Sequence, residues 1–330
     1  MIKKQDVTTD KIVNIFFKYT IPTIIGMIAI SSAAITDGIF VGRFIGPEAL
    51  AVINLIIPFV SLMLGIIIML GSGGCVLCGK LIGENNEKEA SGVFSQIVLI
   101  IFILSLIVCF TVLNFPYKTA QILGANRDVA PNVVLYIKNY LYFLPLQLLG
   151  LGISFFARVN GKPGLTSFAL LFSAVMNVVL DWILIIYFKM GISGAALATG
   201  ISQSMTFFIL LPSFFSSKSN LKFIIPNKFR KETFFSIING LSEFLNESSS
   251  GIVVFVFNHV LMMQSGIDGV AAFTIVNYFL YSGCLIAYSV VASIHGPVSI
   301  NFGAGLIERT REFLKAAVWF NLILGIILAL

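Results

Sequence analysis

The sequence predicts an all-α protein that crosses a membrane many times. Of its 330 residues, 58% are hydrophobic and only 11% are charged, which is too little polar surface to cover a soluble globule of this size. The apolar runs are about 20 residues or longer, the length that an α-helix needs to cross a hydrocarbon core of roughly 30 Å. They do not alternate in ten-residue segments, so a transmembrane β-barrel is excluded.

Polar or glycine-containing turns separate these runs and give the expected order of helices. After a polar lead, the first helix carries Pro22 as an expected bend. The connection 116–132 contains a short amphipathic piece, which we expect at the membrane interface. The predicted helices lie at 12–40, 49–80, 91–115 and 133–157, with two more between 158 and 215, then at 233–259, 270–297 and from 308 onward.

The longest polar break in the chain predicts a boundary between two lobes. Residues 216–232 are polar and basic, unlike any other connection. We therefore expect an amino-terminal lobe of six helices at 1–215, a cytoplasmic linker at 216–232, and a partial carboxy-terminal lobe at 233–330.

Three short matches at one offset predict that the second lobe repeats the first. The segment 46–52 (GPEALAV) resembles 266–272 (GIDGVAA), and KLIGEN around Gly83 resembles INFGAG around Gly303; segments 21–25 and 241–245 align at the same offset of 220 residues. Six helices separate the copies, so the repeat is parallel, with its axis along the membrane normal. A complete second lobe would end at about residue 430 to 450, whereas this sequence has 330 residues. We therefore expect the second lobe to be incomplete, with only helices 7 to 9 of a twelve-helix protein present.

Four polar residues within the apolar runs are candidate functional residues. Ser173, Asn177 and Asp181 are spaced by four, so they lie on one face of a helix, and Asp37 lies in a polar part of the first helix. An Asp at the centre of a lipid-facing helix costs roughly 2.5 to 3.5 kcal/mol or more, so this face is expected to line a bundle interior or a wet cavity. A structural polar contact between helices is the alternative.

The distribution of basic residues predicts the orientation. Fifteen Lys and Arg residues fall on the side of the amino terminus and five on the other side. Because Lys and Arg concentrate in cytoplasmic loops, we expect a cytoplasmic amino terminus in a multi-pass protein of the plasma (inner) membrane. The same scatter over loops argues against nucleic-acid binding despite the net charge of +6.

Several other classes of function lack their motifs. His259 and His295 are far apart, and the CxxC at 75–78 has no second pair, so no metal site is expected. No nucleophile set for an enzyme and no GxxxxGK[ST] for ATP binding is present. We expect no cofactor, and we expect a monomer whose partners are small molecules and the lipid bilayer. A structural or channel protein would not need a long duplication with buried acids.

Five sequence elements together carry a family resemblance. They resemble the multidrug and toxic compound extrusion (MATE) family, and most closely its bacterial multidrug branch. The elements are Pro22 to Gly46 with Asp37 before IFVGRFIG, the turn GENN at 83–86, RxxGxP at 158–163, MNxxLD at 176–181, and GAAxAT at 194–199.

The resemblance implies a function and site residues. Members of the family have twelve helices in two lobes around a V-shaped cavity and export organic cations in exchange for protons or sodium. Asp37, Asn177, Asp181 and Thr199 match the polar cluster of the amino-terminal lobe. Two carboxylates in one dry lobe repel, so at least one is expected to hold a proton part of the time.

A second possible cation or substrate site lies in the other lobe. Glu247, with Glu243 one turn before it, matches a cation-binding Glu of some members, although its spacing from Gly240 is shorter than in the better-known pattern. The leading hypothesis is therefore a secondary antiporter for cationic amphipathic molecules. The alternative is a flippase of lipid-linked precursors from a related superfamily, which would line its cavity with several Arg or Lys residues, whereas here the basic residues fall in predicted loops.

Overall fold

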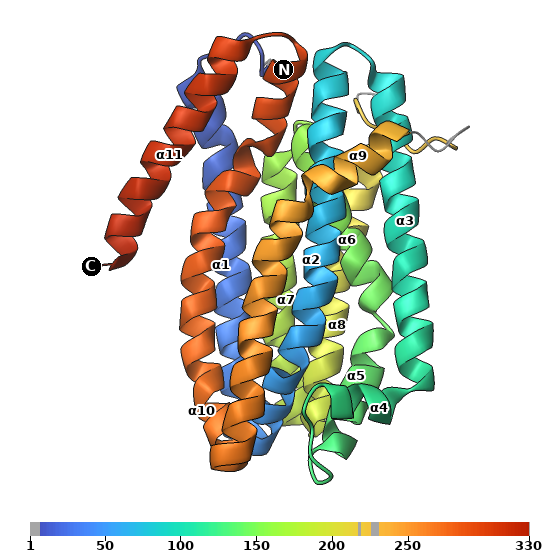
Figure 1. The fold of residues 1–330 in the computed structure, drawn as a ribbon, viewed down its shortest axis with the longest axis vertical. Coiled ribbons are helices and arrows are strands. Elements are labelled where there is room, and N and C mark those ends of the chain that lie inside the picture. The colour runs from blue at the N-terminus through green and yellow to red at the C-terminus, as the bar shows by residue number, and fades with distance from the viewer. Residues whose placement is uncertain (1–6, 217–218, 226–230, 330) are drawn as a thin grey trace.

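The computed structural model describes residues 7–216, 219–225 and 231–329, and in these ranges all regular secondary structure is helical (Figure 1). The all-α fold class predicted from composition is confirmed. The helices are α1 (Ile12–Phe44), α2 (Pro47–Gly83), α3 (Glu87–Asn114), α4 (Pro116–Ile122), α5 (Ala130–Leu141), α6 (Leu144–Val159), α7 (Pro163–Asp181), the π-helix η1 (Trp182–Tyr187), α8 (Gly191–Leu210), the 3-10 helix η2 (Leu211–Phe214), α9 (Lys231–Asn239), α10 (Leu241–Gly303) and α11 (Ile307–Ala329).

Six of these helices, with α10 counted once, are long and apolar enough to span a membrane, or seven when the bent pair of α5 and α6 is counted as one span. The predicted fourth helix at 133–157 is thus wrong as one straight element. It is broken near residues 142–143, and its two parts are bent by 57°. Pro145 explains the break in part, because proline is favoured in the first turn of a helix and α6 begins there.

α10 contains two passes rather than one. Its 63 residues include Gly266, whose φ of 62° and ψ of −150° interrupt the helix. The two halves run antiparallel and meet at the lower end of the bundle in Figure 1. They correspond to the predicted helices at 233–259 and 270–297, although the first begins with the separate helix α9 and a break at Gly240.

α2 packs along α10 through small residues. A Cβ on Gly65 would lie 3.1 Å from Ser248 Oγ, and a Cβ on Gly251 would lie 2.8 Å from Ser61 Cβ. Small residues let helix backbones approach closely, which is how apolar helices gain contact energy in lipid. α1 lies against the second half of α10, where Thr20 Oγ1 and Ser293 Oγ are 2.8 Å apart.

The described part of the predicted linker, 219–225, lies over the ends of α3 and α6. Asn160 Nδ2 donates to Ser219 Oγ at 2.7 Å, and the backbone N–H of Asn220 donates to Asn160 Oδ1 at 2.9 Å. The rest of 216–232, apart from its two ends, lies outside the described residues. The division into lobes, the 220-residue repeat and the missing helices stay predictions.

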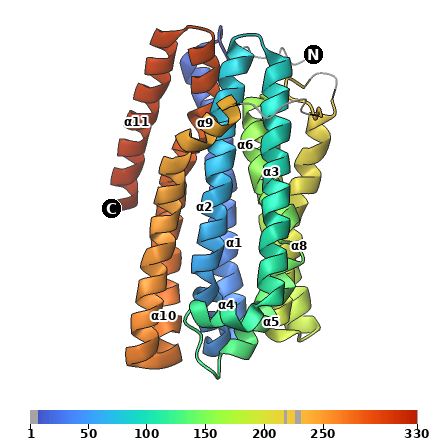
Figure 2. The same cartoon turned by 45° about the vertical axis from the view of Figure 1, so that its right-hand side comes forward.

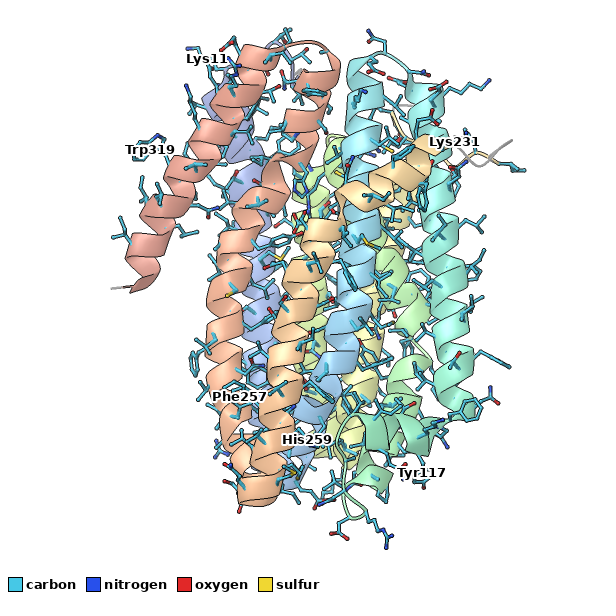
Figure 3. The ribbon with its side chains drawn as sticks, in the orientation of Figure 1. Lys11, Tyr117, Lys231, Phe257, His259 and Trp319 are labelled. Atoms are coloured by element: carbon cyan, nitrogen blue, oxygen red, sulfur yellow. The ribbon has the colours of Figure 1, made fainter. Side chains whose placement is uncertain are left out.

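The two ends of the bundle differ in their residues. Lys11 and Lys231 lie at the upper end in Figure 3, and Tyr117 lies at the lower end, as does His259 on α10. α11 diverges from the other helices toward its carboxyl end in both Figure 1 and Figure 2, and Trp319 projects from its outer side with 67% exposure.

Candidate functional site

A pair of buried carboxyl groups lies between α1 and α7. Asp37 is 9% exposed and Asp181 is fully buried. Their carboxyl groups lie within hydrogen-bonding reach of one another. The two residues are more than a hundred positions apart in the sequence, so it is the packing of α1 on α7 that brings them together. The structure thus brings these two candidate residues together.

The pair is poor in other hydrogen-bond donors. Asp37 Oδ1 and both carboxyl oxygens of Asp181 accept no hydrogen bond from another described group. Two facing carboxylates without donors would repel strongly in a medium of low dielectric constant. A shared proton or a bound cation would remove that repulsion. The arrangement is therefore chemically suited to exchanging a cation.

Asp181 stands where α7 changes its winding. It is the last residue of α7, and the π-helix Trp182–Tyr187 follows directly. Single π-helical turns inside α-helices are rare and occur frequently at functional sites. Asn177 precedes Asp181 by one turn, is 7% exposed, and its Nδ2 has no partner among the described groups. Ser173, one turn earlier, instead donates to the carbonyl of Ser202 on α8 at 2.8 Å.

Thr199 of α8 joins the site through a tyrosine. Its side chain is half-buried and hydrogen-bonds the side chain of Tyr136 from α5. Tyr136 also lies close enough to Asp37 for an electrostatic interaction between the two groups. The structure thus brings all four predicted residues of this cluster into one region, with Tyr136 between Thr199 and Asp37.

A second tyrosine reaches the pair from α10. Tyr278 interacts electrostatically with both Asp37 and Asp181. Its ring packs so closely on Gly38 of α1 that a Cβ at Gly38 would overlap it. Sequence analysis missed both tyrosines. Tyr136 could have been found from its spacing of four from Tyr140, with which it stacks at 6.1 Å between ring centroids. For Tyr278 the available sequence signal was Gly38 beside Asp37, which leaves room for a large side chain from a facing helix.

The second predicted set of acids lies elsewhere on α10. Glu247 is half-buried, and its Oε1 accepts a hydrogen bond of 3.2 Å from the hydroxyl of Tyr281. Glu243, one turn earlier, interacts with Tyr288. Their described neighbours are therefore different from those of Asp37 and Asp181, and the two sets form separate sites.

One basic residue is not where the sequence suggested. Arg158 was expected in a turn after the fourth helix, but it lies in the last turn of α6 and is only 3% exposed. The reason is that α6 ends against the second half of α10, where a Cβ on Gly296 would lie 3.3 Å from Val159 Cα. This contact covers the end of α6 and buries the guanidinium.

Comparison with known proteins agrees with this fold. The family model described as MatE matches residues 22–183. The chain is 25% identical over 320 residues to the "Probable multidrug resistance protein YoeA" of Bacillus subtilis (strain 168), covering 93% of this chain and 68% of the relative. It is 26% identical over 307 residues to the "Multidrug export protein MepA" of Staphylococcus aureus (strain N315), covering 91% of this chain and 66% of the relative. The chain thus spans about two thirds of the length of these curated relatives.

Solved structures share the fold over nearly the whole chain. The structure of the "MATE multidrug transporter DinF-BH" superposes with a TM-score of 0.90 at 22% identity and covers 98% of this chain and 74% of that one. An "outward-facing conformation of a multidrug resistance MATE family transporter of the MOP superfamily" gives a TM-score of 0.84 at 22% identity, covering 98% of this chain and 72% of that one.

The helices define a multi-pass helical membrane protein, with a pair of acids buried inside it. Together with the matches in sequence, this places the protein in a class of membrane transporters rather than enzymes. The match of residues 22–183 to the MatE family model and the likeness to multidrug resistance and export proteins agree with the family that its sequence elements indicated.

Proposed function

We propose that this protein is a secondary active antiporter, which exports organic cations in exchange for H⁺ or Na⁺ by alternating access. The match to the MatE family model and the names of the curated relatives support export of small molecules in general. The observation that carries the finer proposal is the facing pair of carboxyl groups at Asp37 and Asp181.

The pair supports coupling because its charge can change. A transporter couples two fluxes when binding of one ligand favours one conformation by a differential free energy. A proton shared by Asp37 and Asp181 would do this. A sodium ion could instead use the carboxylates with the side-chain oxygens of Asn177 and Thr199, since oxygen ligands suit hard cations.

The substrate class follows from the second site. Glu247 with its tyrosine partner Tyr281 offers a negative charge in a half-buried setting beside an aromatic ring. Cations are attracted both to carboxylates and to aromatic faces. Relatives are named for multidrug export and resistance, which fits small, cationic and amphipathic substrates. We infer that Glu247 binds the substrate or a second coupling cation, with Glu243 as an accessory acid.

We propose that the conformational change of alternating access occurs at the interface of α1 and α2 with α10. Its small residues allow one set of helices to slide or tilt against the other. In this proposal the lobes at 1–215 and 233–330 move as units, the protein acts as a monomer, and its amino terminus is cytoplasmic. The described basic residues Lys11 and Lys231 share one end of the bundle, which supports that orientation (Figure 3).

A flippase of lipid-linked precursors is less well supported. A pyrophosphate substrate calls for several basic groups in the cavity. Among the described residues, Arg158 is the only Lys or Arg that is buried.

The proposal is tested by transport in inside-out vesicles. A pH gradient and a sodium gradient are imposed separately, and uptake of a fluorescent organic cation into the vesicles, which corresponds to export from the cell, is recorded. We expect one of the two gradients to drive transport. Transport without either gradient, or equal transport in vesicles that lack the protein, would contradict antiport.

A further inference from the structure

Three polar side chains meet between α6 and the second half of α10 without partners. Nε and Nη1 of Arg158, the hydroxyl of Tyr288 and Nδ1 of His295 are all buried, and none makes a hydrogen bond with another described group. Arg158 interacts electrostatically with both Tyr288 and His295, so the three groups lie close together. Tyr288 also interacts with Glu243 and Glu247, so this cluster adjoins the Glu247 site, and it is separate from the Asp37 site.

The surrounding packing holds Arg158 in place. Its guanidinium carbon lies 5.2 Å from the centroid of the Phe155 ring, a cation–π contact. Phe155 in turn presses on α2, where a Cβ at Gly71 would lie 2.6 Å from its Cδ2. Cys75 of α2 lies beside the guanidinium. The site is therefore built by three helices, and Arg158 is not free to turn toward solvent.

The charge of Arg158 has no direct counterpart. Nε and Nη1 of its guanidinium meet no acceptor among the described groups, so no described carboxylate pairs with them. Glu243 and Glu247 interact electrostatically with Tyr288, whereas the groups that interact with Arg158 are Tyr288, Cys75 and His295. A buried charge without a counter-charge is strongly unfavourable, whereas a buried charge that is paired and hydrogen-bonded is tolerated.

We infer that Arg158, Tyr288 and His295 form a binding site for one small monovalent anion, of the size of chloride. The guanidinium supplies the charge, and the tyrosine hydroxyl and the imidazole N–H supply neutral donors. A single cation balances a single negative charge, which disfavours phosphate. Arg158 is only 3% exposed, which disfavours a bulky lipid headgroup as the ligand of its guanidinium. The site does not depend on the transport activity proposed above.

Binding is tested with radiolabelled chloride on the purified, detergent-solubilised chain, in gluconate buffer. We expect saturable binding of one chloride per chain. Arg158→Gln should abolish it, and Tyr288→Phe should weaken it roughly tenfold, the effect of losing one hydrogen bond to a charged group. Lys118→Gln is the matched control, because this side chain is exposed on α4, which contributes no residue to the site, and it should bind like the native chain.

Glu243→Gln separates an external anion from an internal one. If Arg158 pairs with an external anion, this variant binds chloride as the native chain does or more tightly. If Glu243 is the true counter-charge in solution, the native chain binds no chloride and the variant does, which overturns the inference. Competition with unlabelled acetate distinguishes a site for carboxylates as well as halides from one for halides alone.

Two further results would also overturn the inference. One is absence of saturable binding to the native chain, and the other is unchanged binding to Tyr288→Phe. Tyr288→Phe keeps the charge and the ring, so it remains informative if Arg158→Gln fails to fold. Bromide can replace chloride in crystals, where its anomalous signal should lie beside Arg158.

Discussion

Gly83 and Gly303 pack against each other's helices at one end of the bundle. A Cβ on Gly83 would overlap the carbonyl oxygen of Ile300, and a Cβ on Gly303 would overlap the carbonyl oxygen of Lys80. The two glycines are the last residues of α2 and α10, and both pairs are related by the offset of 220 residues. The contact is therefore reciprocal, as expected for two copies of one element that meet across an axis.

We expect Gly303→Ala to open this end of the bundle. The added methyl group would overlap the backbone of Lys80, which cannot shift without moving its helix. We therefore expect the conformation in which this end is closed to be destabilised by roughly 1 to 3 kcal/mol. The measurement is labelling of Ser299→Cys by a membrane-impermeant thiol reagent, with the four native cysteines replaced by alanine. Labelling should be at least several-fold faster in Gly303→Ala, because this destabilisation of the closed conformation raises the population of the open one.

Gly325→Ala is the control for this prediction. It lies inside α11, and nothing lies within 4 Å of a Cβ there. Alanine favours helix over glycine by up to about 1 kcal/mol, so this variant should be at least as stable as the native chain. Equal labelling of Ser299→Cys in both variants would show that the glycine contact does not hold this end closed.

Asp181→Asn should remove gradient-driven efflux. Asparagine keeps the size and hydrogen-bonding capacity of the side chain but cannot release a proton. Coupling free energies of roughly 1 to 3 kcal/mol correspond to effects of roughly 5- to 150-fold. Initial rates of gradient-driven efflux should therefore decrease by a factor in that range. Rates are measured in proteoliposomes at matched protein content, and dye binding is measured in parallel.

Asp268→Asn is the matched control for the acid pair, since Asp268 lies near the turn of α10, far from Asp181 in sequence. It should transport like the native protein. If Asp181→Asn does so too, its carboxyl group is structural, and coupling has to depend on Asp37 or Glu247.

A pair of asparagines at the other end of the bundle should contribute to stability. Asn54 Nδ2 donates to Asn258 Oδ1 at 2.7 Å, and Asn258 Nδ2 donates to the carbonyl of Asn54 at 3.0 Å. Asn54→Ala leaves a buried amide without its partner and should lower the free energy of unfolding by roughly 1 to 3 kcal/mol. Unfolding is followed by titration with a denaturing detergent.

The double variant with Asn258→Ala gives the interaction itself. Interhelical hydrogen bonds in membrane proteins contribute on average about 0.6 kcal/mol, so the coupling should be near that value. Asn139→Ala serves as control, because the Asn139 side chain bonds within its own helix to Leu135. A coupling of zero would mean that the pair is dispensable.

Glu247→Gln should weaken the binding of a cationic dye without affecting a neutral one. The substitution removes the charge but keeps the shape and an acceptor for the Tyr281 hydroxyl. We expect roughly tenfold weaker binding, the loss of one favourable charge interaction of about 1.4 kcal/mol. Tyr281→Phe keeps the acid and should have a smaller effect. An unchanged dye affinity in Glu247→Gln would place the substrate elsewhere.

The orientation is open to direct measurement. A cysteine placed at Tyr117 should react with an impermeant reagent from outside intact cells, and one placed at Lys231 should react only after the cells are opened. These residues lie at opposite ends of the bundle (Figure 3). The reverse pattern would refute a cytoplasmic amino terminus.

Composition and helix periodicity were enough to predict the fold class and most helices of this protein. Apolar length in lipid leaves few alternatives to a helix, since backbone groups have to be satisfied within the segment. Asp37, Asn177 and Asp181 could also be recognised from sequence, because a carboxylate in an apolar run is costly unless it has partners.

Only the tertiary structure decided which residues meet. The contacts of Asp37 with Asp181 and with Tyr278 join helices far apart in sequence, and periodicity on one helix carries no information about the facing helix. The same holds for Arg158, which a short-range rule assigned to a loop. Its burial results from the approach of α6 to Gly296 on α10, a packing that close-fitting small residues allow and that no single segment encodes.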